Sequence, residues 1–131
     1  MLRLFTTVLL SLILAVPAVA ADWTWSKEDT AREVLGLGLT VIDWGQTNDI
    51  RNHDGMIELN PILGRTPDQE AIRDYFVGVL VLHPLISAAL PARADLFGYE
   101  LKPRTAWQYF YIGVEATATI SNYNGGLRLK Y

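Results

Sequence analysis

Polar and apolar side chains follow a helical period along three long segments of this chain. The first, residues 27–52, repeats small and polar side chains every three or four positions, whereas the second is apolar from residue 75 to residue 92. The third covers residues 104–122. No alternating pattern is long enough to indicate a β-strand. We predict an all-α fold, a small helical bundle in which a signal or anchor helix over residues 1–20 precedes one domain of three main helices over residues 21–131.

Local signals set the expected ends of these helices. Ser26 is a suitable N-cap for the first helix. Thr66, Pro67 and Gln69 resemble a capping box with proline at the first helical position, so the second helix is expected to begin there. Pro84 lies inside that helix and removes one backbone hydrogen bond, which predicts a bend beside His83. The third helix opens at a proline and stops at two consecutive glycines.

The N-terminus has the pattern of an export signal. A short basic start over residues 1–3 precedes an apolar run over residues 4–16, and small residues follow at 18–21. We expect cleavage after Ala20. An uncleaved anchor helix over residues 2–19 is the alternative. With either a cleaved signal or an uncleaved anchor, we expect the protein to be exported to the bacterial envelope.

The distribution of apolar residues favours a membrane location. Half of the chain is hydrophobic, and residues 75–92 approach the length needed to cross a bilayer. The first helix has a shorter apolar part, residues 34–44, and the third is aromatic at its start, as is typical of a span anchored at one interface. We predict a transmembrane bundle in the inner membrane with lipid as its partner. A soluble periplasmic protein is the alternative. Basic residues are balanced between the two ends of the bundle, so their count does not orient it.

Composition narrows the function classes. The chain has no cysteine, which excludes disulfides and thiol chemistry. Its net charge is −3 and no block of Lys or Arg occurs, so nucleic acid is not an expected partner, whereas a protein partner stays open. No motif of serine hydrolases or of nucleotide-binding proteins is present.

One face of the first helix is small and polar. Its members follow at spacings of four, three and four, with Gln46 beside them: Gly36, Thr40, Asp43 and Thr47. One interpretation is close packing between helices, with the polar groups bonding across the interface. The other places Asp43 in a cavity as a metal ligand, a proton acceptor or an anchor for a cationic ligand.

The last helix carries a matching stripe of polar side chains: Gln108, Tyr111, Glu115, Thr119 and Asn122. If the two stripes face each other, Asp43 and Glu115 approach, and one of these carboxyl groups stays protonated unless a cation intervenes. His83 can supply that cation, or can join Asp43 and Glu115 as ligands of a divalent metal. The spacing matches no known metal motif, and a lone buried histidine with a structural role is the alternative.

The connection between the first two helices contains Glu58, Asn60 and Pro61. An asparagine before proline favours an extended or turn conformation. This segment is either a rigid turn that closes one end of the bundle or the mouth of a cavity near Asp43.

These residues together resemble a family of short bacterial and phage-borne membrane or exported proteins that has no assigned reaction. The resemblance lies in the following motifs: Asp43-x-x-Gln46-Thr47, Glu58-x-Asn60-Pro61-Ile62-Leu63-Gly64, Tyr75-Phe76 with His83, Gln108-Tyr109, Ile112-Gly113-x-Glu115 and Asn122. The resemblance implies a helical architecture and supports these residues as site candidates, but it indicates no activity.

We therefore expect a small envelope membrane protein with a binding or structural role rather than an enzyme. Its candidate site is a buried polar cluster made of these residues: Asp43, Gln46, Thr47, Glu58, Asn60, His83, Gln108, Glu115 and Asn122. Two alternatives stay open. One is an enzyme or transporter-like module that binds a metal or a polar head group, and the other is a soluble periplasmic partner protein.

Overall fold

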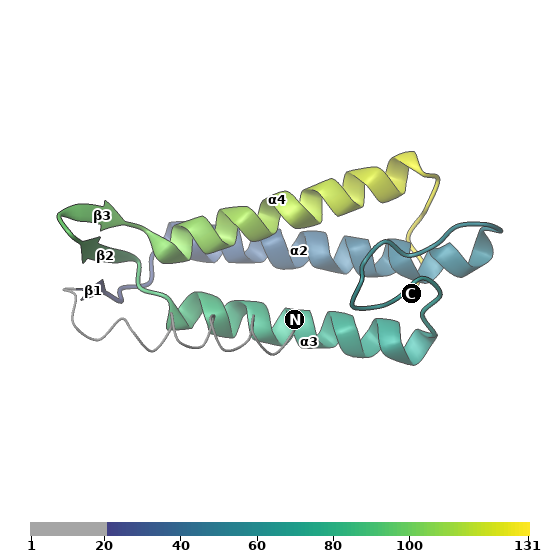
Figure 1. Ribbon diagram of the computed structural model, residues 1–131, viewed down its shortest axis with the longest axis horizontal. Coiled ribbons are helices and arrows are strands. Elements are labelled where there is room, and N and C mark those ends of the chain that lie inside the picture. Colours follow the sequence, from purple (N-terminus) through teal and green to yellow (C-terminus); the bar gives the residue numbers. More distant parts are fainter. Residues whose placement is uncertain (1–20) are drawn as a thin grey trace.

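The computed structural model describes residues 21–131, so the predicted leader over residues 1–20 lies outside the described residues. Three long helices form the body of the protein, and a small sheet lies at one end of it (Figure 1). The elements follow in this order: β1 Ala21–Asp22, α2 Lys27–Asp49, the 3-10 turn η1 Ile50–Asn52, α3 Gln69–Ala89, β2 Arg93–Leu96, β3 Tyr99–Leu101 and α4 Pro103–Asn124.

The three helices lie side by side, with α2 and α4 running in one direction and α3 in the other (Figure 1). They contain 23, 21 and 22 residues. At 1.5 Å per residue each is about 31 to 35 Å long, which matches the hydrocarbon core of a bilayer at about 30 Å. We call the end that carries the strands the sheet end, and the opposite end, where α2 connects to α3, the loop end.

The predicted helices are confirmed, and one predicted helix start is wrong. Ser26 caps α2 in a full capping box with Asp29. The N-cap of α3 is Asp68 rather than Thr66, because the Asp68 carboxylate accepts a hydrogen bond of 2.8 Å from the backbone N–H of Ala71. Pro84 lies inside α3, which nevertheless continues to Ala89.

The prediction of a purely α-helical fold is also wrong, because β1, β2 and β3 form an antiparallel sheet in that order. Phe97 and Gly98 both have positive φ angles, 52° and 83°, and form the two-residue turn between β2 and β3. The strands contain two, four and three residues. Such short strands do not contain enough residues to show an alternation of polar and apolar positions in the sequence.

The C-terminal tail folds back onto α2 at the loop end. The backbone N–H of Lys130 donates to the Gly45 carbonyl at 2.9 Å, and the side chain of Asn48 donates to the Lys130 carbonyl at 3.1 Å. A Cβ atom at Gly45 would lie 2.9 Å from the Tyr131 ring, so glycine is what allows the tail to approach this closely. The C-terminal tail is therefore a packed part of the fold.

The distribution of side chains is inverted relative to a soluble domain. The fully buried positions are mostly polar: Asp29, Glu33, Thr40, Gln46, Thr47, Asp49, His83, Ser87, Arg104, Gln108 and Glu115. Large apolar side chains are instead exposed along all three helices: Val34, Leu35, Val41, Ile42, Val77, Val81, Leu82, Leu85, Tyr109, Phe110, Val114 and Ile120. Of the helices that the structure describes, only α3 is long and apolar enough to span a membrane by composition alone. The polar residues that α2 and α4 bury lower their average hydropathy.

Candidate functional site, a buried polar network

A chain of charged and polar side chains joins the three helices near the sheet end. We call it the sheet-end network, and its members are Asp29, Arg32, Glu33, His83, Arg104 and Gln108. It begins at the capping box of α2, because Asp29 both caps the helix and faces inward.

Asp29 accepts hydrogen bonds from both arginines of the network. Its Oδ1 accepts from Arg32 Nη2 at 2.6 Å and its Oδ2 accepts from Arg104 Nη1 at 3.3 Å, while Ser26 donates to Oδ2 from its backbone and its hydroxyl. Burial alone raises the pKa of Asp29, but the hydrogen bonds from Ser26, Arg32 and Arg104 together outweigh it and leave the pKa below its usual value. Asp29 is therefore a stable anion.

Arg104 is only 1% exposed and connects four parts of the chain. Its Nε donates to the carbonyls of Ser87 and Leu90, both at 3.0 Å, and its Nη1 donates to the Thr24 carbonyl at 2.8 Å. The guanidinium also lies 4.8 Å from the centre of the Trp25 ring. It thereby fixes the end of α3, the start of α4 and the segment before α2 to one another.

Gln108 and Glu33 extend this network toward the middle of the helices. Gln108 accepts from Arg32 Nε at 2.9 Å and donates through Nε2 to Glu33 Oε2 at 3.0 Å. The other oxygen of Glu33 lies 2.6 Å from Nδ1 of His83. The His83 ring is stacked between Tyr111, at 3.7 Å between ring centres, and Trp107, at 5.2 Å.

A second group of polar side chains lies between α2 and α4 in the middle of the bundle. We call it the central cluster, and its members are Thr40, Asp43, Gln46, Tyr111, Glu115, Thr119 and Asn122. The hydroxyl of Thr40 is hydrogen bonded to that of Tyr111, and Asn122 Nδ2 donates to Asp43 Oδ1 at 2.7 Å. Asp43 and Glu115 lie on facing helices, as predicted, because hydrogen bonds join α2 to α4 on both sides of them, and Glu115 acts electrostatically on Asp43.

Small residues of α2 allow this close approach. A Cβ atom at Gly36 would lie 2.9 Å from the Tyr111 ring, so the aromatic side chain packs directly on the helix backbone. The predicted small and polar face of α2 is therefore a real interface with α4. It packs closely, as one interpretation predicts, and Asp43 lies at this interface, where it accepts a hydrogen bond from Asn122.

The connecting loop contributes Glu58 and Asn60. Glu58 Oε1 accepts from the backbone N–H of Asn60 at 2.7 Å, and Asn60 Oδ1 accepts from that of Ile62 at 2.9 Å. These bonds make the segment a rigid turn, as one interpretation predicts. Glu58 also acts electrostatically on Asp43, and Asn60 lies beside Tyr75 of α3. The loop therefore both closes the bundle and borders the central cluster.

The predicted metal site of Asp43, His83 and Glu115 does not form. His83 is bonded to Glu33 in the sheet-end network, because its ring is stacked on Trp107 and Tyr111 with Nδ1 turned toward α2. No three His, Cys, Asp or Glu side chains within residues 21–131 are arranged to hold a metal ion. Gln108 likewise belongs to the sheet-end network rather than to the cluster with Asp43.

Three charged residues of the sheet-end network were not predicted from the sequence. Asp29, Glu33 and Arg104 are all buried, but none of them is among the site residues predicted from the sequence. A signal for them exists, because Asp29, Arg32 and Glu33 lie three and four positions apart on α2, and Arg104 lies four positions before Gln108. Thr47 is buried as predicted, but in the part of the chain that the structure describes its side chain forms no hydrogen bond with the other candidates.

Comparison with protein-family models, with curated proteins and with solved structures finds no match to this chain.

Proposed function

We propose that this chain is an integral membrane protein of the bacterial envelope whose three helices cross the bilayer around an internal polar network. We call the apolar middle parts of the three helices, residues 34–46 of α2, 75–90 of α3 and 106–121 of α4, the crossing segments, and the helical turns that flank them complete the length of each span. The role we propose is binding and structural, with the network holding the three helices together and presenting the central cluster inside the membrane.

The inverted distribution of side chains carries this proposal. Within the three crossing segments the only Asp, Glu, Lys or Arg side chains are Asp43 and Glu115, and neither is on the outer surface. Leu82 and Leu85 are 58% and 60% exposed, and Phe110 is 65% exposed. Such a surface around the whole bundle exceeds the apolar patches that soluble monomers tolerate. Lipid tails cover it without cost, and the polar groups of the sheet-end network bond to one another inside the bundle.

Aromatic side chains at the two ends support the same arrangement. Trp23, Trp25 and Tyr99 are exposed at the sheet end, and Tyr123 and Tyr131 are exposed at the loop end. Tryptophan and tyrosine are favoured at the level of the lipid head groups, where an apolar ring and a polar tip are both accommodated.

The structure also favours one orientation of the bundle. The loop end carries five basic side chains that belong to neither network: Arg51, Arg65, Arg73, Arg128 and Lys130. At the sheet end, Arg32 and Arg104 are engaged with Asp29, which leaves Lys27, Arg93 and Lys102. An excess of basic residues on the cytoplasmic side predicts that the loop end faces the cytoplasm. Cleavage of an export signal after Ala20 predicts the same orientation.

Membrane extraction and cysteine labelling test the proposal. The full chain is expressed in bacteria and its membranes are washed with alkaline carbonate, which releases peripheral proteins but leaves spanning proteins in the pellet. Because the chain has no cysteine, a single cysteine can be placed at Leu82 in the apolar surface or at Asp54 in the loop as the matched control. We expect a water-soluble maleimide to label Asp54→Cys in opened membranes and to leave Leu82→Cys unlabelled until detergent is added. Release of the chain by carbonate, or equal labelling at both positions, contradicts the proposal.

A further inference from the structure

We propose that Asp43 and Glu115 form a proton-binding site inside the bilayer, in which at least one of the two carboxyl groups is protonated at neutral pH and exchanges its proton with water at the loop end. This inference rests on the proposed membrane location, and it assigns a ligand to the central cluster.

The bonding of the two carboxyl groups is incomplete. Asp43 Oδ1 accepts from Asn122, but Glu115 Oε2 is buried and has no hydrogen-bond partner within the described residues 21–131. Glu115 as a residue is only 6% exposed. An anion with an unpaired oxygen at this depth in a membrane costs several kcal/mol. A proton on the pair removes both the charge and the unpaired acceptor.

Among residues 21–131, the groups that face the pair supply no positive charge. From the loop Glu58 acts on Asp43, and from α3 Tyr75 faces both carboxyl groups. From α4 Tyr111 faces Glu115 and is hydrogen bonded to Thr40. His83 of α3 reaches the opposite side of Tyr111, where it is bonded to Glu33. Two carboxylates and a third nearby, without a cation between them, favour protonation of at least one.

Two further acceptors flank the pair and favour a proton over a metal ion. Gln46 lies one helical turn beyond Asp43 on α2, and Thr119 lies one turn beyond Glu115 on α4. Gln46 Oε1 and Thr119 Oγ1 are both buried, and neither has a hydrogen-bond partner in the part of the chain that the structure describes. A protonated carboxyl group provides an O–H donor, which is what such oxygens lack. The carboxylates of residues 21–131 also offer no arrangement of three ligands for a metal.

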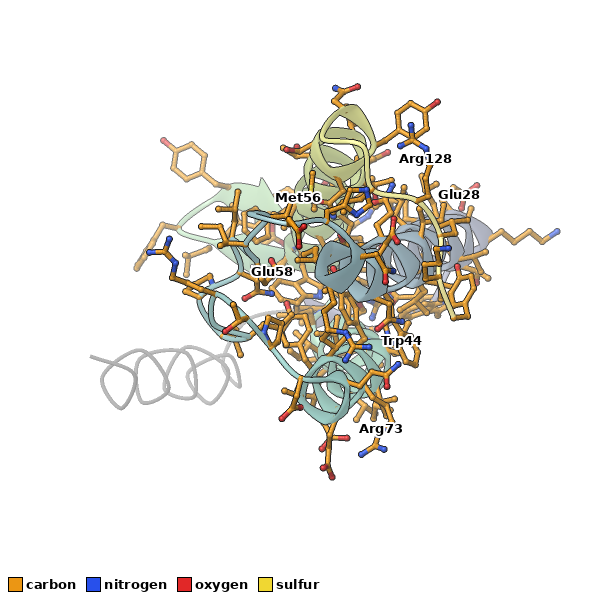
Figure 2. The ribbon with its side chains drawn as sticks, turned by 90° about the vertical axis from the view of Figure 1, so that its right-hand side faces the viewer. Glu28, Trp44, Met56, Glu58, Arg73 and Arg128 are labelled. Carbon is orange, nitrogen blue, oxygen red and sulfur yellow. The ribbon has the colours of Figure 1, made fainter. Side chains whose placement is uncertain are left out.

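One cavity at the loop end borders the central cluster. Its volume is about 460 Å³ between α2, α4 and the tail, and Gln46 and Thr119 are both in its wall. A second cavity of about 200 Å³ is lined by Glu58, Met56 and Asn122, and Asn122 is the residue whose amide is bonded to Asp43. Figure 2 looks along the helices from this end and shows Met56 and Glu58 of the loop beside α2. The second cavity, with Glu58 and Asn122 in its wall, is the route that we propose for protons between the loop end and Asp43.

Infrared spectroscopy of the full chain in lipid vesicles tests this proposal. A protonated carboxyl group has a C=O stretching band well separated from those of carboxylates, and the band shifts when the proton is exchanged for deuterium. We expect wild-type protein at pH 7 to show this band and to shift it in heavy water. The double variant Asp43→Asn and Glu115→Gln, which retains the shapes of both side chains, is expected to lose the band. The matched control Glu100→Gln, at an exposed carboxylate of the hairpin, is expected to keep it.

The outcomes separate this inference from the proposed membrane location. A band that is absent from the wild type at pH 7, with or without a metal ion that copurifies, overturns the proton site. Persistence of the full band in the double variant also overturns it. If the double variant does not fold, the wild-type measurement still decides. Carbonate washing of the same membranes shows separately whether the chain spans the bilayer, so failure of one proposal is distinguishable from failure of the other.

Discussion

Replacement of Arg104 by methionine is expected to destabilise the protein more than replacement of any exposed arginine. Methionine fills a similar volume but provides no donor. The change removes three hydrogen bonds of 3.0 Å or shorter to the carbonyls of Ser87, Leu90 and Thr24, and it removes the ion pair with Asp29. All of these acceptors are then left without the guanidinium in the interior of the sheet end.

The magnitude follows from these contacts. Breaking a buried ion pair by removing one partner costs about 3 to 5 kcal/mol. Asp29 retains Arg32 and Ser26, so its charge is not left unpaired, and we expect the lower end, about 3 kcal/mol. That is roughly a hundredfold change in the folding equilibrium. Arg104→Lys retains the charge but not the fork of donors, and we expect a loss of about half that size.

The assay is reversible unfolding of the purified chain in mixed detergent micelles, followed by tryptophan fluorescence. Trp25 lies against the Arg104 guanidinium and reports on this region directly. Arg93→Met is the matched control, because Arg93 is 61% exposed and its ion pair with Glu100 is 3.6 Å long. A surface pair of this kind contributes about 1 kcal/mol or less. The reasoning is refuted if Arg104→Met unfolds within about 1 kcal/mol of Arg93→Met.

Three further predictions concern other parts of the fold. Gly36→Val is expected to lower the free energy of unfolding by about 1 to 3 kcal/mol, because the new side chain would meet the Tyr111 ring. Gly38→Ala, where a Cβ meets nothing within 4 Å, should leave stability unchanged or improve it. Equal effects of the two variants in the same unfolding assay would contradict this prediction. Hydrogen bonds from the Asn52 side chain and from the backbone N–H of the tail hold the pKa of Asp49 below its usual value, so this contact stabilises the protein above the unfolded-state pKa and is lost as pH falls through the lower folded-state pKa. The protection of the tail amides, measured relative to the intrinsic exchange rate at the same pH, should therefore fall in acid and, at neutral pH, in Asp49→Asn. Unchanged tail protection in that variant would show that the contact is unimportant. In sealed spheroplasts a membrane-impermeant maleimide should label Asp95→Cys in the hairpin but not Asp54→Cys in the loop, and the reverse pattern would invert the proposed orientation.

Helix formation and the polar faces of the helices could be predicted from the sequence because both depend on local spacing. Residues three and four positions apart share one face of a helix, so the stripes that contain Asp43 and Glu115 are visible without a structure. The capping box at Ser26 is likewise local. These features were confirmed because no distant part of the chain is needed to produce them.

Contacts between distant residues could not be predicted in the same way. The polar stripe of α4 divides between two networks, with Gln108 bonded to Glu33 and Asn122 bonded to Asp43, and the division depends on the depth at which α2 and α4 are aligned. His83 was assigned to the wrong carboxylate for this reason. Its partner is set by the stacking of its ring on α4, a contact that sequence spacing does not encode.

The sequence by itself determined three helices, their polar faces and an unusually apolar composition, because each of these is a property of neighbouring residues along the chain. Only the tertiary structure decided which groups pair, that Asp29 and Arg104 are buried, and that apolar side chains cover the outside of all three helices. The reason is physical. Burial and pairing are decided when helices from distant parts of the chain pack together, and an amphipathic pattern does not state which of its two faces is turned inward.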